Sequence, residues 1–246
     1  MRATAIVVIL PGMAEYDVWA PDYDDWAADM TEDVPFYVDL AREAAGDTLV
    51  ELGVGTGRIA IPIARETGKR VIGIDRSPAM LAVGRERAGE LPIEFREGDF
   101  RDFTLEEQVA LVICPFRALM HAPTWQDKRR VFESVAAALE PGGRFAWNVF
   151  VFSPFIATRL HGQVQTRAGD LWETVRHMPA DNRIDLERGR GDRADGVVRL
   201  WWATKSELEG LIDVAGLEVE ALYGWFDRRP FDDESQEFLY VARKPG

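Results

Sequence analysis

The residues best suited to binding a ligand form one glycine-rich segment, Glu51-Leu52-Gly53-Val54-Gly55-Thr56-Gly57-Arg58. It follows an apolar run typical of a strand and precedes a run with helical periodicity, the context that a nucleotide-binding glycine loop needs. Glycines let the backbone turn sharply and let a ligand approach peptide N–H groups. The G-x-G-x-G spacing differs from the G-x-G-x-x-G of dinucleotide enzymes, and the Gly-Lys-Ser or Gly-Lys-Thr ending of a phosphate-binding loop is missing. The pattern therefore disfavours phosphate ligands.

Three carboxylates add to this prediction. Glu51, at the strand end beside the loop, would repel a pyrophosphate but attract a cationic ammonium or sulfonium group. Asp75 ends the apolar run 71–74, about twenty residues beyond the glycines, where a carboxylate can accept both ribose hydroxyls; the alternative is a charge at a helix N-terminus. Asp99 follows the next strand and is expected to hold an adenine amino group while Phe100 covers the ring. A plain turn aspartate is the competing interpretation of Asp99.

The candidate general base is His121. It lies a few residues past the carboxyl end of the strand expected at 109–114, where ligands bind in open α/β sheets. A surface or capping histidine is an equal alternative. His161 and His177, in or beside a later insertion, are further candidates with a structural alternative. Arg117 has the side chain to bind an acceptor carboxylate, although an ion pair with one of the many surface acids is favoured.

These residues must be positioned by alternating strands and helices. Short apolar runs alternate with longer helical ones from Thr48 onward, which indicates successive βαβ units and a mainly parallel sheet. We expect an α/β, Rossmann-like fold with a seven-stranded sheet and helices on both faces. The expected strands are 48–52, 70–74, 93–97, 109–114, 143–148, 217–222 and 238–243, and the expected helices are 57–66, 78–88, 124–139 and 204–215. The turn Pro141-Gly142-Gly143 is expected to stop the helix before it.

Two segments depart from this rhythm. The region 13–47 opens with an aromatic and acidic helical stretch in which Tyr16-Asp17 and Tyr23-Asp24 are seven residues apart, on nearly one helix face, and Pro21 argues against one unbroken helix. In the segment 150–202, apolar and polar residues alternate at 171–176, 183–187 and 197–202, which suggests antiparallel strands. This segment is expected to be an inserted cap. We therefore predict one domain over 1–246, with a cofactor-binding core at 48–150 and a final helix and strands at 203–246. The arginine-rich segment 188–193 is expected to be a solvated hairpin turn.

Composition limits the partners. A formal net charge of −13 at pH 7 repels nucleic-acid phosphates and anionic lipid surfaces, so neither nucleic acid nor membrane is an expected partner. Cys114 is the only cysteine, which rules out intramolecular disulfides and fits a reducing cytoplasm. We expect no metal site. The apolar run 5–10 is too short to span a bilayer, and residues 1–12 are expected to be a dispensable leader, with Met13 as a candidate natural start.

Four segments together resemble the class I S-adenosylmethionine-dependent methyltransferases, and the resemblance runs from about Tyr16 to Lys244. They are Glu51-Leu52-Gly53-Val54-Gly55-Thr56-Gly57-Arg58, Gly73-Ile74-Asp75-Arg76-Ser77-Pro78-Ala79-Met80-Leu81, Gly98-Asp99-Phe100-Arg101-Asp102-Phe103 and Leu139-Glu140-Pro141-Gly142-Gly143. The resemblance implies S-adenosyl-L-methionine as cofactor. One departure is the run Val109-Ala110-Leu111-Val112, where such enzymes usually carry an acid at the start of the fourth strand.

The resemblance also implies roles for single residues. Glu51 and the glycine loop would meet the methionyl end of the cofactor, Asp75 the ribose, Met80 with the Asp99-Phe100 pair the adenine, and Cys114-Pro115-Phe116 the region near the methyl group. The segment with Tyr16 and Tyr23 is similar to the N-terminal helices that close over cofactor and acceptor. The predicted catalytic residues are His121 and Tyr23. The predicted cofactor-binding residues are Tyr16, Glu51, Gly53, Gly55, Gly57, Arg58, Asp75, Arg76, Met80, Asp99, Phe100, Cys114 and Phe116.

The predicted activity is methyl transfer to an amine or hydroxyl of a small molecule, such as a secondary metabolite or an amino sugar. Two alternatives remain at this point: an NAD(P)-dependent dehydrogenase with an atypical glycine loop, and a non-catalytic S-adenosylmethionine-binding scaffold. The sequence leaves the acceptor and the choice between monomer and homodimer open.

Overall fold

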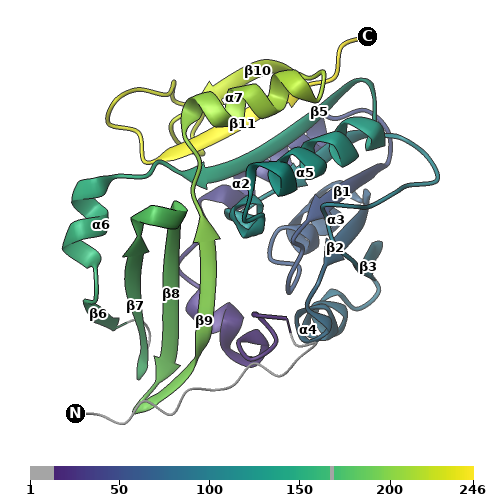
Figure 1. Cartoon of the computed structure of the whole chain (residues 1–246). Coiled ribbons are helices and arrows are strands. Elements are labelled where there is room, and N and C mark those ends of the chain that lie inside the picture. The colour runs from purple at the N-terminus through teal and green to yellow at the C-terminus, as the bar shows by residue number, and fades with distance from the viewer. Residues whose placement is uncertain (1–13, 167–168) are drawn as a thin grey trace.

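The computed structural model describes residues 14–166 and 169–246, which form a large sheet, its covering helices and a smaller second sheet (Figure 1). The large sheet has seven strands in the order β10-β11-β5-β4-β1-β2-β3. Strand β11 runs antiparallel to β5 and to β10, and the other neighbours pair in parallel. The strands are β1 Thr48–Leu52, β2 Arg70–Asp75, β3 Ile93–Glu97, β4 Val109–Cys114, β5 Leu139–Phe150, β10 Glu218–Tyr223 and β11 Glu237–Arg243.

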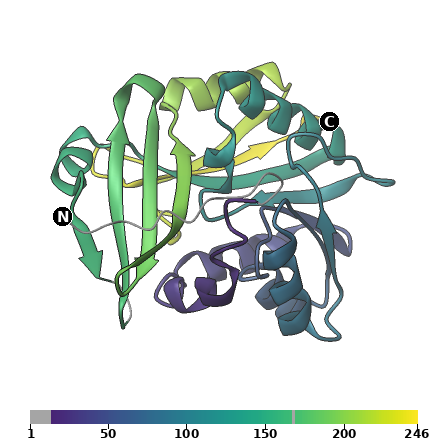
Figure 2. The same cartoon turned by 60° about the horizontal axis from the view of Figure 1, so that its bottom comes forward.

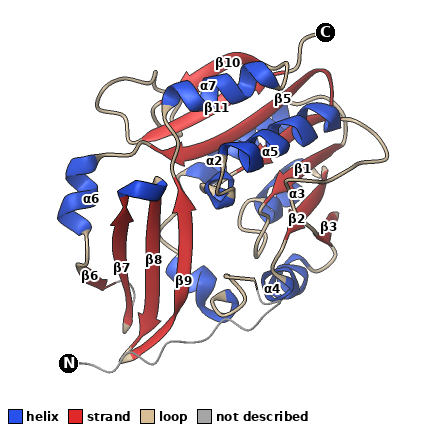
Figure 3. Ribbon diagram, viewed as in Figure 1, coloured by secondary structure: helices blue, strands red, loops and turns tan. Residues whose placement is uncertain are grey.

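Helices cover both faces of this sheet, as Figure 3 shows. The helices α2 Asp33–Glu43, α3 Ala60–Thr67 and α4 Pro78–Ala88 pack on one face, and α5 Trp125–Ala138 and α7 Lys205–Val214 pack on the other. Successive side chains of a strand point to opposite faces. Val112 of β4 accordingly lies in the core beneath α5, whereas its neighbours Leu111 and Ile113 lie in the core beneath α2 and α3. The predicted fold class is confirmed.

Several bounds differ from the prediction by a few residues, among them the starts of α3 and β5. Helix α3 begins at Ala60 and not at Gly57, because Gly57 has a φ of +79°, which a right-handed helix does not allow. Strand β5 begins at Leu139, so Pro141-Gly142-Gly143 lies inside it. The helix before it ends at Ala138, three residues earlier than that turn. The expected strands at 48–52, 93–97 and 109–114 and the helix at 78–88 have the predicted bounds.

The segment between β5 and α7 forms an antiparallel cap. Its four strands pair in the order β6-β7-β8-β9, with β6 Val164–Thr166, β7 Leu171–Met178, β8 Arg183–Arg190 and β9 Arg193–Trp201. Helix α6 Pro154–Leu160 leads into it. Figure 2 shows the cap on one side of the N-terminal segment and α4 on the other. The insertion is therefore an antiparallel sheet, as predicted.

The predicted solvated turn at 188–193 is partly wrong. Arg190-Gly191-Asp192-Arg193 does turn from β8 into β9. Arg188, however, is only 1% exposed, and its guanidinium lies 4.4 Å from the ring centroid of Trp19. The reason is strand alternation, since Ile184, Leu186 and Arg188 point to the same face of the cap.

The N-terminal segment is not one continuous helix, as predicted from Pro21. A 3-10 turn at Ala20–Asp22 contains that proline near its start, and the short helix α1 Tyr23–Trp26 follows. Within the described residues, no helix is long and apolar enough to cross a membrane. The predicted leader and the candidate start at Met13 lie outside the described residues.

Candidate functional site

The site begins where the chain order of the sheet reverses, between β1 and β4. Ligands of open α/β sheets bind in the crevice at the carboxyl ends of the strands at such a point. The loop after β1 carries Gly53, Gly55 and Gly57 with φ values of +74°, +53° and +79°. A Cβ atom on Gly53 would lie 2.7 Å from the Cβ of Ala118, in the segment after β4. Glycine is therefore required there both by conformation and by the close approach of these two segments.

Asp75, at the end of β2, holds the glycine loop and the next helix in place. Its Oδ2 atom accepts a hydrogen bond from the Gly55 N–H at 2.8 Å, and its Oδ1 atom accepts one from the Ser77 N–H at 2.9 Å. Burial raises the pKa of Asp75, while these backbone donors act in the opposite direction. Each carboxylate oxygen can accept a further hydrogen bond. Asp75 lines the cavity described next, so this capacity is available to a ligand.

The N-terminal segment closes the site through its two Tyr-Asp pairs. Asp17 accepts a hydrogen bond from the Ser77 hydroxyl at 2.6 Å, and Asp24 accepts one from the Thr56 hydroxyl at 2.7 Å. Both acids thus attach the segment to the loops after β2 and β1. The neighbouring rings of Tyr16 and Tyr23 line the cavity. In each of the two pairs, therefore, the aromatic ring covers the cavity and the acid anchors the N-terminal segment.

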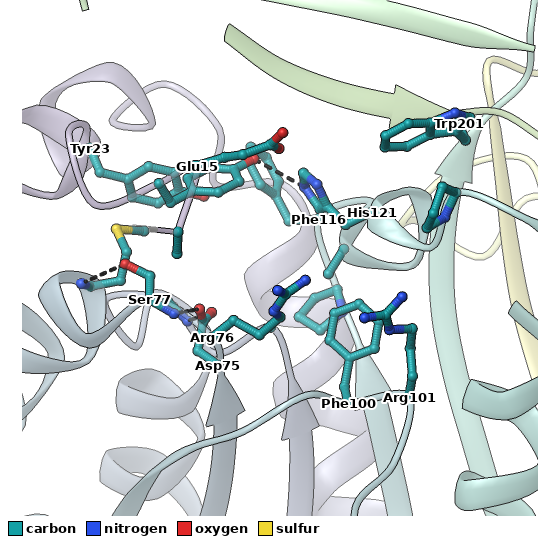
Figure 4. Close-up of a pocket in the computed structure, with 18 residues that line it drawn as sticks. Glu15, Tyr23, Asp75, Arg76, Ser77, Phe100, Arg101, Phe116, His121 and Trp201 are labelled. Carbon is teal, nitrogen blue, oxygen red and sulfur yellow. Dashed lines mark hydrogen bonds between the residues drawn. The ribbon is translucent and has the colours of Figure 1, made fainter. Parts of the chain in front are cut away.

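A cavity with a volume of about 350 Å³ lies between the N-terminal segment and the strand ends (Figure 4). Ten of the predicted site residues line it, namely Tyr16, Tyr23, Gly53, Gly55, Asp75, Arg76, Met80, Phe100, Phe116 and His121. It is also lined by residues that the sequence analysis did not place in the site, among them Glu15, Arg101 and Trp201. Trp201 belongs to the cap, so only the folded arrangement of the insertion brings it here.

Two predicted residues lie behind the glycine loop. Glu51 is 2% exposed, and its Oε2 atom accepts no hydrogen bond from any described residue. Burial raises its pKa well above the usual range, and the charge of Arg58 opposes this. Arg58 itself is held by Asp33, with Nη1 to Oδ1 at 2.7 Å, and stacks over the Phe116 ring at 4.3 Å. Neither side chain lines the cavity.

Three other predicted residues also lie outside the cavity lining. Gly57 is in the turn before α3. The carboxylate of Asp99 is paired with Arg101, which donates hydrogen bonds to both of its oxygens and lowers the pKa of Asp99 despite partial burial. Cys114 is fully buried, and burial raises the pKa of its thiol. These positions support the walls of the cavity.

His121 lies in the 3-10 turn Ala118–His121 after β4 and faces Tyr16. The Tyr16 hydroxyl is 3.2 Å from its Nε2 atom, and the two rings meet edge to face at 5.3 Å. Burial, with a smaller effect of Arg76, lowers the pKa of His121 to about 4. The imidazole is therefore neutral at neutral pH and has one nitrogen that can accept a proton or a hydrogen bond.

A second, larger cavity of about 900 Å³ adjoins the first. Tyr16, Phe116 and His121 line both cavities, so they stand at the junction. The rest of the larger cavity is formed by the cap strands, α6 and the loop before β11. The arrangement gives a cofactor-sized cavity over the strand ends and an adjoining cavity under the cap.

The turn at the junction has a strained backbone. Phe116 and Arg117 have φ values of +52° and +65°, which are uncommon for residues with side chains. The side chain of Asn148 holds this turn, because its Oδ1 atom accepts from the Phe116 N–H at 2.8 Å and its Nδ2 group donates to Glu237 at 3.0 Å. Glu237 in turn accepts from Arg117 Nε at 3.0 Å. Asn148 also accepts from the Tyr37 hydroxyl, so the buried network is satisfied.

Several other predictions have a structural outcome. Arg117 forms an ion pair as favoured, but its partner is the buried Glu237 and not a surface acid. Neither His161 nor His177 lines a cavity; the His177 N–H donates to Nδ1 of His161, and the His177 ring packs against Phe152. Asn148 was missed because a lone asparagine near a strand end has no distinguishing sequence pattern.

The fold and the cavity define a Rossmann-like enzyme that holds its cofactor at the carboxyl ends of a parallel sheet. Residues 49–143 match the family described as methyltransferase domain. The chain is 26% identical over 225 residues to the cypemycin N-terminal methyltransferase of a Streptomyces species, covering 85% of this chain and 87% of that protein. These matches, and the likeness to a solved methyltransferase structure, support a class I S-adenosylmethionine-dependent methyltransferase.

Two further comparisons agree with this identification. The structure of the CcbJ methyltransferase of Streptomyces caelestis has a TM-score of 0.83 and 27% identity, covering 96% of this chain and 99% of that one. The dTDP-4-amino-2,3,4,6-tetradeoxy-D-glucose N,N-dimethyltransferase of Saccharopolyspora spinosa is 34% identical over 119 residues, covering 48% of this chain and 46% of that protein. The predicted enzyme class and cofactor are confirmed.

Proposed function

We propose that the smaller cavity binds S-adenosylmethionine and that the larger one presents an amine of a small molecule to it. Two observations support the fit of the cofactor. The glycine loop is free of Cβ atoms where it lines the cavity, and Asp75 has unused acceptor capacity there, suited to a ribose diol. Met80 and Phe100 supply apolar surface for the adenine. Glu51 lies behind the loop with an unpartnered Oε2, and a cationic group close to the loop would favour its charged form over the neutral form that burial favours.

The charge of the larger cavity favours an amine over a hydroxyl acceptor. Asp233, Glu234 and Glu237 are acids of its lining. Among the described residues of its lining, Arg117 is the only Lys or Arg, and it is paired with Glu237. An ammonium group is attracted to such a surface, and a carboxylate acceptor is repelled. This excess of acids is the observation on which the choice of an amine rests.

The chemistry needs little from side chains. When bound, S-adenosylmethionine supplies a methyl group that is already activated by its sulfonium. The protein has to hold the acceptor nitrogen in line with that group and exclude water. An ammonium must first lose its proton. The neutral imidazole of His121, whose Nε2 lies 3.2 Å from the Tyr16 hydroxyl at the junction, is placed to pass that proton to solvent, because with a pKa of about 4 it does not keep a proton at neutral pH. Tyr23 acts as a wall of the cofactor cavity and not as a base, because burial raises its pKa.

The acceptors named for two relatives are consistent with an amine. One is a cypemycin N-terminal methyltransferase and the other an N,N-dimethyltransferase of an amino sugar nucleotide. We propose a cytoplasmic enzyme that acts without nucleic acid or membrane as partner, which the net charge of −13 and the free Cys114 thiol support.

The test is methyl transfer from labelled S-adenosylmethionine to a panel of primary and secondary amines and alcohols with matched skeletons. We expect label in the amines and none in the alcohols. Label found mainly in the alcohols would overturn the amine assignment. Calorimetry with S-adenosylmethionine and NADH, run alongside, separates cofactor binding from transfer: tight NADH binding without S-adenosylmethionine binding would contradict the cofactor assignment, and cofactor binding without any transfer would indicate a non-catalytic scaffold.

A further inference from the structure

The larger cavity has one apolar wall and one acidic wall. The apolar wall is the inner face of the cap, where Val175 of β7 pairs with Leu186 of β8 and Ile184 of β8 pairs with Leu200 of β9. Because alternate residues of a strand share a face, these four side chains form one continuous surface. All four are partly exposed, so the surface is not filled by the protein itself.

Large apolar side chains at the rim of this wall are exposed to solvent. Phe155 and Ile156, on α6, line the cavity and are 86% and 42% exposed. Exposed apolar side chains that gather at a cavity mark a surface that a ligand covers. Their position next to the cap wall extends the apolar surface outward from the junction.

The acidic wall comes from a different element. Asp233 and Glu234 belong to the loop before β11 and line the same cavity. The described lining contains Arg117 as its one guanidinium, and Glu237 neutralises it. The cavity therefore combines an apolar surface with the negative charges of Asp233 and Glu234.

The volume sets the size of the ligand. The cavity that we assign to the nucleoside cofactor measures about 350 Å³, whereas the adjoining one measures about 900 Å³. Cavities that bury drug-sized ligands measure roughly 300–1,000 Å³. A small polar amine would leave most of the apolar wall in contact with water.

From these features we infer that the acceptor is a cationic amine joined to a large apolar body, with the amine at the junction formed by Tyr16, Phe116 and His121 and the body on the cap wall. This inference rests on the proposed function, since it places the amine beside the cofactor cavity. It excludes small polar amines and neutral or anionic apolar molecules as the preferred ligands.

The experiment is calorimetric titration of the full chain, saturated with S-adenosylhomocysteine, with n-octylamine, ethylamine and n-octanol. We expect n-octylamine to bind at least about tenfold more tightly than ethylamine, since each buried methylene adds to affinity. We expect it also to bind about threefold or more tightly than n-octanol, because the octanol hydroxyl carries no charge. Equal affinities within either pair would overturn the inference.

Two variants locate the binding. Leu186→Gln adds a polar group to the cap wall and should weaken n-octylamine binding about tenfold without changing affinity for S-adenosylhomocysteine. Val214→Gln, at a 47% exposed position on α7 outside the cavity, is the matched control and should change neither. Unchanged n-octylamine affinity in a folded Leu186→Gln variant would contradict the inference. Failure of the wild type to bind S-adenosylhomocysteine would instead contradict the proposed function, so the two failures are distinguishable.

Discussion

The Tyr16 hydroxyl lies 3.2 Å from the Nε2 atom of His121, and both residues line the cofactor-sized cavity and the larger cavity under the cap. Tyr16 comes from the N-terminal segment and His121 from the turn after β4, so the pair closes the site across 105 positions of sequence. A proton released at the junction of the two cavities has its nearest nitrogen acceptor in this pair. The first two predictions test this relationship.

His121→Asn should lower kcat for an amine acceptor about tenfold to a hundredfold, because the variant keeps a polar side chain but loses the basic nitrogen. Tyr16→Phe should have a smaller effect, since the imidazole remains and loses only its hydrogen-bond partner. Steady-state kinetics with a fixed amine measures both. A His121→Asn variant with wild-type kcat and normal cofactor affinity would show that His121 takes no part in proton transfer.

His121 should also make stability depend on pH. Its pKa is about 4 in the folded protein, whereas an unfolded histidine has a pKa near 6.5, so between these values the unfolded state binds more protons. The contribution of His121 to the free energy of unfolding therefore rises by at most about 3 kcal/mol between pH 4 and about 6.5 and is constant above that pH. Urea unfolding of wild type and His121→Asn at several pH values measures the difference. A difference independent of pH would contradict the lowered pKa.

Gly53→Ala should abolish cofactor binding. Gly53 has a φ of +74°, and an added Cβ would lie 2.7 Å from the Cβ of Ala118 on the cavity wall. Gly68→Ala is the matched control, because Gly68 has a φ of +71° but no atom within 4 Å of the added Cβ. Both variants pay a similar backbone strain of about 1–2 kcal/mol. Calorimetry with S-adenosylmethionine should detect loss of binding in Gly53→Ala only, and equal loss in both variants would show that the close approach does not matter.

Asn148→Ala should lower kcat about tenfold while leaving affinity for S-adenosylmethionine close to wild type, because Asn148 holds the strained Phe116 turn. It should also destabilise the protein by about 2–4 kcal/mol, since buried partners lose their hydrogen bonds. Leu239→Ala is the control for stability alone: Leu239 pairs with Asn148 in the sheet, is buried, and should cost about 2–5 kcal/mol with no change in kcat. Parallel losses of kcat in both variants would assign the effect to stability.

Much of the fold could be predicted from the sequence because its signals are local. The strand at 109–114 is a continuous apolar run that ends before Pro115, and the helix at 78–88 is bounded by Pro78 and Gly89; both have the predicted bounds. The two Tyr-Asp pairs also gave a correct expectation of a shared orientation. Gly57 was predicted to open the helix, but it lies outside it with a φ of +79°. That φ is set by the fold of the loop, and no local sequence pattern indicates it.

Parts of the site could not be predicted from local sequence patterns. The sequence analysis placed Asp99 beside the adenine, but its carboxylate is held by Arg101 two residues later. Arg188 was expected in solvent, whereas alternation from Ile184 and Leu186 would have directed it inward, against Trp19. Asn148 and Trp201 enter the site through long-range packing of β5 and the cap. Such residues depend on which surfaces meet, and a single sequence does not give that information.

The central claim is that Asp75 accepts the ribose hydroxyls of the cofactor. The most direct test is a double-mutant cycle that combines Asp75→Ala with removal of both hydroxyls from the ligand, comparing S-adenosylhomocysteine with its 2′,3′-dideoxy analogue by calorimetry. Wild type should lose about a hundredfold or more in affinity for the dideoxy ligand, because hydrogen bonds to a charged group are lost. Asp75→Ala should bind both ligands with the same weak affinity. An Asp75→Ala variant that still distinguishes the two ligands as strongly as wild type would contradict the account.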